Sequence, residues 1–464
     1  MFRRIAAWLD DRLGVTTVLE HTVFHIIPAD TNWWYVFGSA TLACFMLQVV
    51  TGILLAMTYA PTPESAYDSL LFITDRATLG SILRGLHNFG ATGMVCMVAV
   101  HAAQVFLYAA YKFPREMTWL AGVVLLFCTL GMAFTGQILR WDQNGYWTVT
   151  LFAEMAGRVP VAGPPLVQLV LGGPTVGADT LTRLFAVHVF ILPGIIFTFV
   201  GLHLYSILRH GISELPRPGV IVDPATYRRR YKELLEKTGV PFWPDAAWKD
   251  VVFTVAVIGV ILALAVILGP PALGPAPDPS LQGANPRPDW YFLWLFALLA
   301  LSLPGIETYL ILGTVLVPLV VLIAIPLLAP YGERAPSRRP WAIVAVALTF
   351  LTIAGLIHLG DVAPWSPEIH VGPLPPRVTA GLSGQALAGA QVFEEKDCHA
   401  CHRIDGSGGL RGPDLSTIGD QMTRDQFVSR IINGGTNMPA FGGNITPDQL
   451  NAVVEFLATR RAQP

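Results

Sequence analysis

Charged residues are scarce in this chain. Lysine, arginine, aspartate and glutamate make up 13% of its 464 residues, whereas 53% are hydrophobic and the mean hydropathy is +0.52. A soluble globular domain usually carries about 25% charged residues, so the composition excludes an ordinary water-soluble protein. A net charge of −2 gives no reason to expect a nucleic-acid partner.

Cysteine is also rare. Five cysteines are too few for a disulfide framework, and Cys44, Cys96 and Cys128 fall within apolar runs, where we expect plain packing. The other two belong to the CxxCH sequence Cys398–His402. The first fifteen residues contain no apolar segment of the kind that a secretory signal needs, so none is expected.

Long apolar runs dominate the chain instead. We expect seven membrane spans, at about 33–58, 82–108, 118–139, 182–208, 250–269, 309–329 and 341–360. Residues 1–32 are amphipathic and are expected at the membrane interface. The apolar stretch 291–303 is expected to lie along the outer surface, because Pro304 and Gly305 end it early.

The distribution of basic residues predicts the orientation. Lysine and arginine cluster near the N-terminus and in alternate connections, which places the N-terminus in the cytoplasm. Seven spans then place the C-terminal residues outside.

Four histidines lie in two of the apolar runs. His87 and His101 are 14 residues apart, a step that returns to nearly the same helix face and rises about 21 Å. His188 and His203 are 15 apart, and Pro193 could supply the local unwinding that corrects the extra residue. One such histidine could be a packing residue, but four at these spacings predict two imidazole pairs, each clamping a haem iron.

Two glycine pairs repeat the 14-residue step. They are Gly38 with Gly52 in the first span and Gly122 with Gly136 in the third. Positions without side chains suit helices that face a flat haem, although small-residue helix packing would also explain them. Three arginines near the span ends, which could pair with haem propionates or simply orient the helices, are Arg84, Arg115 and Arg183.

The C-terminal CxxCH sequence predicts a covalently attached c-type haem with His402 as one axial ligand. Met438, in NMPAF, is the preferred second ligand, and Met422 is the alternative. We expect His399 to be a surface residue.

One further motif, Pro288-Asp289-Trp290-Tyr291, lies between a Pro-rich loop and an apolar stretch. A carboxylate there could accept a proton from a hydroxyl group. A helix N-cap is an equally reasonable role for Asp289.

Residues 5–360 resemble the cytochrome b of quinol-oxidising cytochrome bc complexes, and residues 383–460 resemble a class I cytochrome c. The resemblance rests on the histidine and glycine pairs and on FPREMTW (113–119), WDQNGYW (141–147), LTRLFAVH (181–188) and PDWY (288–291). The 15-residue spacing is similar to that of the plastid branch, in which the protein is split after span four.

The resemblance implies a set of functional residues. His87 and His188 would hold the outer haem b, and His101 and His203 the inner one. The quinol-oxidation pocket would be formed by Asp289 and Tyr291 with Gly145, Tyr146 and Trp147. In the cytochrome c part, the matching residues are Cys398, Cys401, His402, Met438 and Pro413, whose carbonyl would orient the ligand histidine.

Two positions depart from the family. Its usual pocket acid is glutamate, whereas here it is Asp289, whose carboxylate is one methylene shorter. The plastid branch attaches an extra haem through a cysteine where this chain has Val36, so that haem is not expected.

We therefore expect an all-α fold, with a polytopic helical bundle around a di-haem four-helix core and a small soluble all-α cytochrome c domain. The expected divisions are 1–210 for the di-haem domain, 211–360 for a three-span domain, 361–382 for a linker and 383–464 for the cytochrome c.

The implied function is quinol:cytochrome c oxidoreduction coupled to proton translocation across a bacterial cytoplasmic membrane. It would use two non-covalent haems b, one covalent haem c and a quinol or quinone substrate. Since the chain has no iron–sulfur ligand set, a Rieske-type partner is expected, with a homodimeric complex and a downstream c-type cytochrome or terminal oxidase. The alternatives are a di-haem membrane anchor for a dehydrogenase or hydrogenase and a tethered electron carrier without quinone chemistry.

Overall fold

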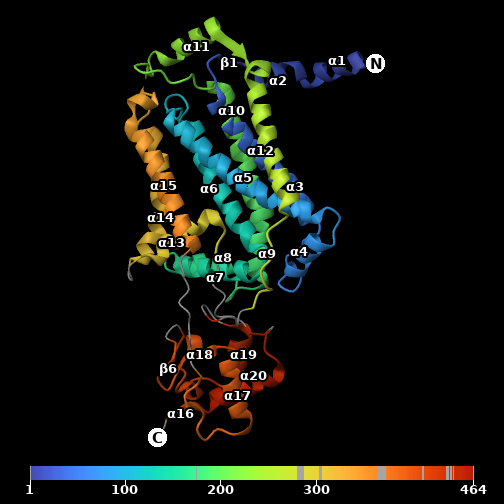
Figure 1. The fold of residues 1–464 in the computed structure, drawn as a ribbon, viewed down its shortest axis with the longest axis vertical. Helices are drawn as coiled ribbons and strands as arrows, with labels where there is room; N and C mark the ends of the chain where they lie inside the picture. The colour runs from blue at the N-terminus through green and yellow to red at the C-terminus, as the bar shows by residue number, and fades with distance from the viewer. Residues whose placement is uncertain are drawn as a thin grey trace.

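The computed structural model describes residues 2–173, 175–278, 287–302, 306–362, 373–409, 412–434, 438, 441–442 and 444–462. These residues form a bundle of long helices and a separate small C-terminal domain, residues 373–462 (Figure 1). The expected all-α fold is confirmed, since the strands of the described residues form three short two-stranded ladders: β1 (Ile26–Pro28) with β3 (Gly239–Pro241), β2 (Ile221–Val222) with β4 (Gly332–Glu333), and β5 (Arg403–Ile404) with β6 (Ser407–Gly408).

Seven helical segments of the described chain are long and apolar enough to cross a membrane, as predicted. They are α3 (Phe37–Ala56), α5 (Gly80–Leu107), α6 (Glu116–Ile138), α9 with α10 (Ala178–Ala186 and Leu192–His210), α12 (Ala247–Ile267), α14 (Glu307–Leu328) and α15 (Pro340–Val362). The apolar stretch Trp290–Ala300, which comprises a short 3₁₀ turn η4 (Trp290–Phe292) and α13 (Leu293–Ala300), is too short to span. The expected stop at Pro304 and Gly305 lies outside the described residues.

The fourth span contains a π-helical turn, η2 (Val187–Ile191), between α9 and α10. The backbone N–H of Leu192 donates to the carbonyl of Val187, which closes a turn one residue wider than an α-turn. Pro193 follows directly and has no N–H to continue the α-helical ladder. This wide turn absorbs the extra residue in the 15-residue spacing from His188 to His203, as the sequence predicted.

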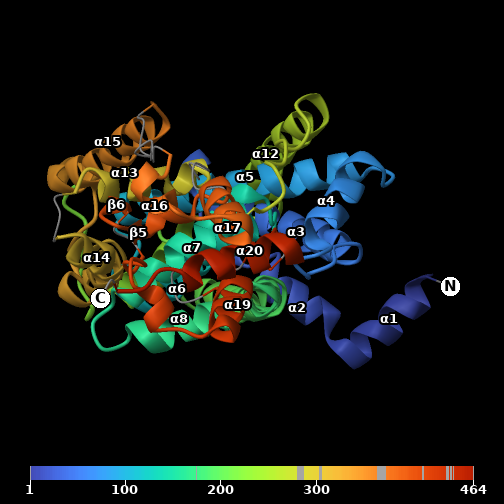
Figure 2. The same ribbon diagram turned by 90° about the horizontal axis from the view of Figure 1, so that it is seen from below.

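The two ends of the bundle carry different elements. The N-terminal face, as we name it, has α1 (Phe2–Leu13), α2 (Val15–Thr22) and α11 (Tyr227–Thr238), whereas the domain face has α4 (Ala66–Asp75), α7 (Gln143–Gly157) and α8 (Gly163–Leu171) (Figure 1). Helices α1 and α2 extend away from the bundle and expose apolar side chains such as Trp8 and Leu13 (Figure 2). The C-terminal domain lies against the domain face (Figures 1 and 2).

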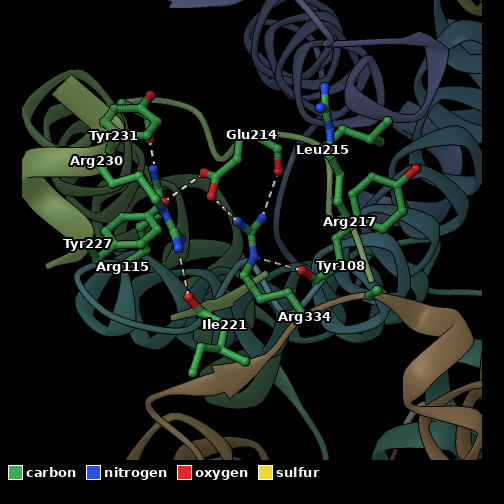
Figure 3. A network of polar contacts seen from close by, with 12 residues as sticks. Tyr108, Arg115, Glu214, Leu215, Arg217, Ile221, Tyr227, Arg230, Tyr231 and Arg334 are labelled. Atoms are coloured by element: carbon green, nitrogen blue, oxygen red, sulfur yellow. Dashed lines mark hydrogen bonds and ion pairs between the residues drawn. The ribbon is translucent and has the colours of Figure 1, made fainter. Parts of the chain in front are cut away.

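A buried ion pair at the N-terminal face joins distant parts of the chain (Figure 3). Arg334 pairs with Glu214 at 2.9 Å, and its side chain is 3% exposed. The same guanidinium donates to the carbonyls of Glu214 (2.8 Å) and Tyr108 (3.3 Å). The segment before the last span is thereby attached to the segments that follow α5 and α10.

A second cation extends this network (Figure 3). Arg115 donates to the carbonyls of Gly211 (2.9 Å) and His210 (3.2 Å) and to the Tyr227 hydroxyl (2.7 Å), which in turn donates to Glu214 at 2.8 Å. Burial opposes ionisation of Glu214, but Arg334 and the Tyr227 hydroxyl outweigh it and hold the pKa of that carboxyl below its usual value. The network therefore stabilises Glu214 as an anion.

The C-terminal domain has its own core. Its helices are α16 (Pro376–Thr379), α17 (Gly384–Glu395), α18 (Cys398–Cys401), α19 (Arg424–Asn433) and α20 (Pro447–Ala458). Helices α17 and α20 pack together through Phe393 and Phe456, whose ring centroids are 5.5 Å apart. Thr423 and Thr446 form capping boxes at the starts of α19 and α20. The expected linker 361–382 is described only at its two ends.

We expect Arg334→Met to lower the thermal unfolding midpoint of the purified protein clearly, since a buried Glu214 without its partner costs roughly 3–5 kcal/mol. Arg338→Met, at an exposed position four residues on, is the matched control. The pKa of Glu214 is depressed in the folded protein, so its ionisation contributes stability that the Glu214→Gln variant lacks. The difference in unfolding midpoint between the two proteins should be fully present above the pKa that this carboxyl has in the unfolded chain. It should shrink as the pH falls through the pKa of the carboxyl in the folded protein. Equal midpoints for Arg334→Met and Arg338→Met would contradict this assignment.

Candidate functional site

Each of the four bundle histidines lies against a glycine on the neighbouring helix. The glycines of α3 meet the histidines of α5, and those of α6 meet the histidines of the fourth span. The pairs, with the distance from a Cβ built on the glycine to the ring Cε1, are Gly38–His101 (3.3 Å), Gly52–His87 (3.2 Å), Gly122–His203 (3.4 Å) and Gly136–His188 (2.9 Å). The structure thus brings all eight predicted residues together in four contacts.

The histidines also face one another in two pairs across the bundle. Ring centroids are 6.4 Å apart for His87 and His188 and 6.5 Å apart for His101 and His203, with interplanar angles of 70° and 73°. A metal bonded to two imidazole nitrogens at about 2 Å each would hold the centroids about 6 Å apart. Both pairs therefore fit a bis-histidine haem iron.

Two threonines orient the histidines of the pair nearer the domain face. The Thr51 hydroxyl donates to the Leu47 carbonyl (2.7 Å) and lies 2.9 Å from Nδ1 of His87, so its oxygen is available to accept Nδ1–H. Thr135 holds His188 in the same way at 2.8 Å. This tautomer leaves Nε2 as the ligand atom. Sequence reasoning missed both threonines, although each directly precedes a haem-facing glycine.

The other pair differs in this respect. The Nδ1 atom of His101 is buried and has no hydrogen-bond partner among the described residues. Next to Gly38, Ser39 donates to Asp250 of α12 at 2.6 Å. This places a carboxylate near the His101 side of the bundle, and the sequence analysis did not single it out. Its signal is an acidic residue within a span.

In the C-terminal domain, the predicted ligands line one cavity with about 410 Å³ of empty space. Its lining is apolar apart from Lys396 and His402: Phe393, Lys396, Cys398, His402, Leu415, Ile431, Met438, Phe441, Ile445, Val453 and Leu457. Met438 and His402 therefore face the same space, whereas Met422 packs against the core elsewhere. The apolar wall and this donor pair fit a c-type haem.

The backbone around His402 fixes the ring. Nδ1 of His402 lies 2.9 Å from the Pro413 carbonyl, as the resemblance implied. A Cβ at Gly412 would lie 2.6 Å from the same ring, so the close approach requires glycine there. The prediction that His399 lies on the surface is wrong. It is 3% exposed and packs near Phe393, because the single turn α18 folds inward.

The PDWY motif forms a polar cluster at the domain face. The Tyr291 hydroxyl donates to Asp289 Oδ2 at 2.8 Å, and Arg140 lies 3.4 Å from Oδ1. Asp289 occupies the N-cap position of η4, but its side chain makes no capping bond. Its backbone N–H donates to Gln137 (3.0 Å), which also donates to Thr148 of α7. The Asp289 carboxylate therefore contacts Tyr291 and Arg140 and does not cap the helix.

Arg140 and Gln137 were missed in the sequence, although both follow the apolar part of α6, where polar residues stand out. The Asp289 side chain is 26% exposed, so it has access to solvent. Burial, and after it the neighbouring Asp289, raises the pKa of Tyr291. Tyr291 therefore stays protonated and donates its hydrogen bond.

Tyr146 lies in a neighbouring aromatic cluster with Trp141 and Trp147. Burial and the nearby Asp278 raise the pKa of Tyr146 to about 12. Among the described residues, no hydrogen bond joins Tyr146 directly to Asp289. At the helix start, a Cβ at Gly145 would lie 2.9 Å from the Ile138 carbonyl.

The three arginines have protein partners. Arg84 donates to Thr74 (3.1 Å) and to the Pro271 carbonyl (2.8 Å), and Arg115 belongs to the Glu214 network. Arg183 is exposed and donates weakly to carbonyls of α8. Pairing with propionates stays a prediction for all three, and these contacts favour a role in orienting the helices.

Two intramembrane histidine pairs and a CxxCH cavity in one chain are the features of a membrane haem protein that transfers electrons. Residues 23–211 match the family described as cytochrome b/b6/petB, and residues 384–457 match the cbb3-type cytochrome c oxidase subunit III family. The chain belongs to the cytochrome b/b6 family and carries a C-terminal cytochrome c domain of the cbb3 type.

Individual relatives agree with this assignment. The chain is 39% identical to cytochrome b6 of Synechococcus sp. strain JA-3-3Ab over 210 residues, which are 45% of the chain and 98% of that protein. It is 35% identical to cytochrome b of Rhodobacter capsulatus over 302 residues, 64% of the chain and 67% of that protein. A solved hyperthermophilic respiratory Complex III chain superposes with a TM-score of 0.64 at 26% identity, covering 77% of this chain and 91% of that one.

The glycine contacts predict graded effects. We expect Gly136→Ala to lose most of one b-type haem, because the new methyl group would lie 2.9 Å from the His188 ring. Gly122→Ala is the control, since its methyl group would lie 3.4 Å from His203, in ordinary contact. The ratio of haem b to haem c, measured as pyridine haemochromes, should be two to one in the unmodified protein. Equal loss from both variants would argue against the Gly136 contact.

The C-terminal cavity predicts which methionine is the ligand. Met438→Leu should abolish the sulfur-to-iron charge-transfer absorption band of the oxidised protein, whereas Met422→Leu should leave it in place. Both substitutions conserve volume, so the domain should still fold. Loss of the band in the Met422 variant alone would reverse the assignment.

Proposed function

We propose that this chain is the b–c subunit of a quinol:cytochrome c oxidoreductase that oxidises a membrane quinol near the domain face. The observation that carries the proposal is the succession of redox sites along one chain, with two histidine pairs across the bundle and a third haem cavity in the C-terminal domain. The similarity to cytochrome b and to a respiratory Complex III supports it.

The ligand assignments follow from the contacts above. His87 with His188 and His101 with His203 would each hold a haem b, and Cys398, Cys401, His402 and Met438 would hold the haem c. When bound, these haems supply reversible single-electron transfer, which no side chain here provides. The chain's own contribution is to orient the rings through Thr51, Thr135 and the Pro413 carbonyl.

Asp289 is our proposed first proton acceptor. Oxidation of a quinol releases two protons and two electrons, so a base must lie beside the hydroxyl that reacts. The Asp289 carboxylate is held by Tyr291 and Arg140 and is partly open to solvent, so it can take a proton and pass it outward. Arg140 and Tyr291 together position an aspartate whose shorter side chain replaces the glutamate usual in the family. Tyr146 would line the same pocket.

At the opposite face we propose that quinone is reduced beside Asp250 and Ser39. Their hydrogen bond places a carboxylate next to the helix position that faces His101. Reduction of a quinone takes up two protons, and a carboxylate at the end of a span can relay them from water. His21 and Arg209 also lie at this face, but both are exposed and form hydrogen bonds within their own helices.

The remaining features of the proposal come from the likeness to bc complexes. A Rieske-type iron–sulfur protein would take one electron of each quinol, and a downstream c-type cytochrome or oxidase would take electrons from the C-terminal domain. The complex would be homodimeric, with its N-terminal face in the bacterial cytoplasm and the C-terminal domain outside. The chain would be divided as the sequence predicts, into a di-haem domain (1–210), a three-span domain (211–360), a linker (361–382) and a cytochrome c domain (383–464).

Asp289→Asn tests the pocket. We expect quinol oxidation by the purified complex to fall roughly 10²–10⁴-fold, the range of a lost general base, while both haems b remain. Asp68→Asn, at an exposed acidic residue in the first turn of α4 on the same face, is the control and should retain activity. Unchanged turnover in Asp289→Asn, with unchanged sensitivity to pH, would refute the assignment of this carboxylate.

A further inference from the structure

The C-terminal domain touches the domain face through two hydrogen bonds between described residues. Asn444 Nδ2 donates to Asp278 Oδ1 at 2.8 Å, and the Thr175 hydroxyl donates to the Asn433 carbonyl at 3.2 Å. In the view from below, α19 and α20 lie over α7 and α8 (Figure 2). The domain is therefore placed over the outer end of the bundle by specific polar groups.

The bundle side of this contact is a firmly held loop. Gln143 of α7 exchanges side-chain hydrogen bonds with the backbone of Asp278 (2.9 and 2.5 Å), and its own N–H donates to the Pro275 carbonyl at 2.9 Å. Asp142 accepts from the Gly274 N–H at 3.1 Å. These hydrogen bonds fix residues 274–278 to the start of α7. Gln143, which makes most of them, lies three residues before Tyr146. When the C-terminal domain is docked, it therefore contacts a loop that is bonded to α7, the helix that contains Tyr146 of the proposed quinol pocket.

The domain side of the contact borders the haem cavity. Asn444 precedes Ile445, and Asn433 lies two residues after Ile431; both isoleucines line the cavity together with Met438. The edge that meets the bundle is therefore the edge on the methionine side of the haem cavity.

The contact also borders an open space. An open cleft with about 1600 Å³ of empty space lies between Gly173 and residues 175–179 on one side and α19 with its C-terminal end on the other. Asp179 lines one wall of this space and Arg430 lines the other. Small, polar interfaces between domains of one chain favour reversible association.

We propose that Gly173 and residues 175–179, together with residues 274–278, form a reversible docking site for the chain's own C-terminal domain. Docking turns the Met438 side of the haem cavity toward the quinol pocket, and the domain leaves this site to meet its electron acceptor. The second part rests on the proposed function, whereas the docking itself does not.

Cross-linking in the full-length complex tests the docking. Thr175→Cys with Asn433→Cys, treated with a short bismaleimide, should be linked efficiently, whereas Thr175→Cys with Ala380→Cys should not, because α16 lies on the far side of the domain (Figure 1). Adding Asn444→Asp places two carboxylates in contact and should lower the linked fraction several-fold. The exchange Asp278→Asn with Asn444→Asp restores an amide–carboxylate pair and should recover it.

The outcomes separate the two proposals. Equal linking of both cysteine pairs, or a linked fraction that ignores Asn444→Asp, would overturn the docking site. If docking is confirmed, quinol-dependent reduction of an external cytochrome c should fall at least several-fold in linked chains. Undiminished turnover in linked chains would overturn the proposal that the C-terminal domain must leave the docking site to reach its acceptor. Absence of quinol oxidation in the unmodified complex would refute the proposed function while leaving the cross-linking result valid.

Discussion

The close contact between an imidazole ring and a backbone without a Cβ is the constraint on which the bundle depends. Each of the four histidines lies against a glycine on the next helix, and at Gly136 the ring would lie 2.9 Å from an added Cβ. These contacts set the distance between α3 and α5 and between α6 and α10. The π-helical turn serves the same constraint, because it restores His188 and His203 to one face despite their 15-residue spacing.

The two faces of the bundle place charged groups in different ways. At the N-terminal face, Arg334 and Arg115 are buried and Glu214 is 14% exposed, and all three are held by ion pairs or hydrogen bonds, so this end is held rigidly. The match to the Synechococcus cytochrome b6 covers 98% of that protein over 210 residues. Arg334, which donates to the Tyr108 carbonyl, therefore joins the part of this chain that matches the cytochrome b/b6 family to the part that follows it.

At the domain face, the Asp289 carboxylate is left accessible to solvent. Asp289 has an arginine on one oxygen, a tyrosine hydroxyl on the other and partial exposure to solvent, which are conditions for accepting a proton and releasing it. The same face holds the C-terminal domain by two hydrogen bonds beside an open cleft. Rigidity at one end and loose association at the other agree with a membrane part that stays fixed while a carrier domain moves.

The sequence by itself determined the helical class, the seven spans, the histidine and glycine pairs and the CxxCH motif. These are properties of spacing and hydropathy along single helices, which depend on local geometry alone. Only the tertiary structure decided which glycine meets which histidine, that Met438 rather than Met422 faces His402, and that His399 is buried. It also supplied Thr51, Arg140 and the Asp278–Asn444 contact, because each joins residues from separate elements, and no periodicity in one element specifies its partner in another.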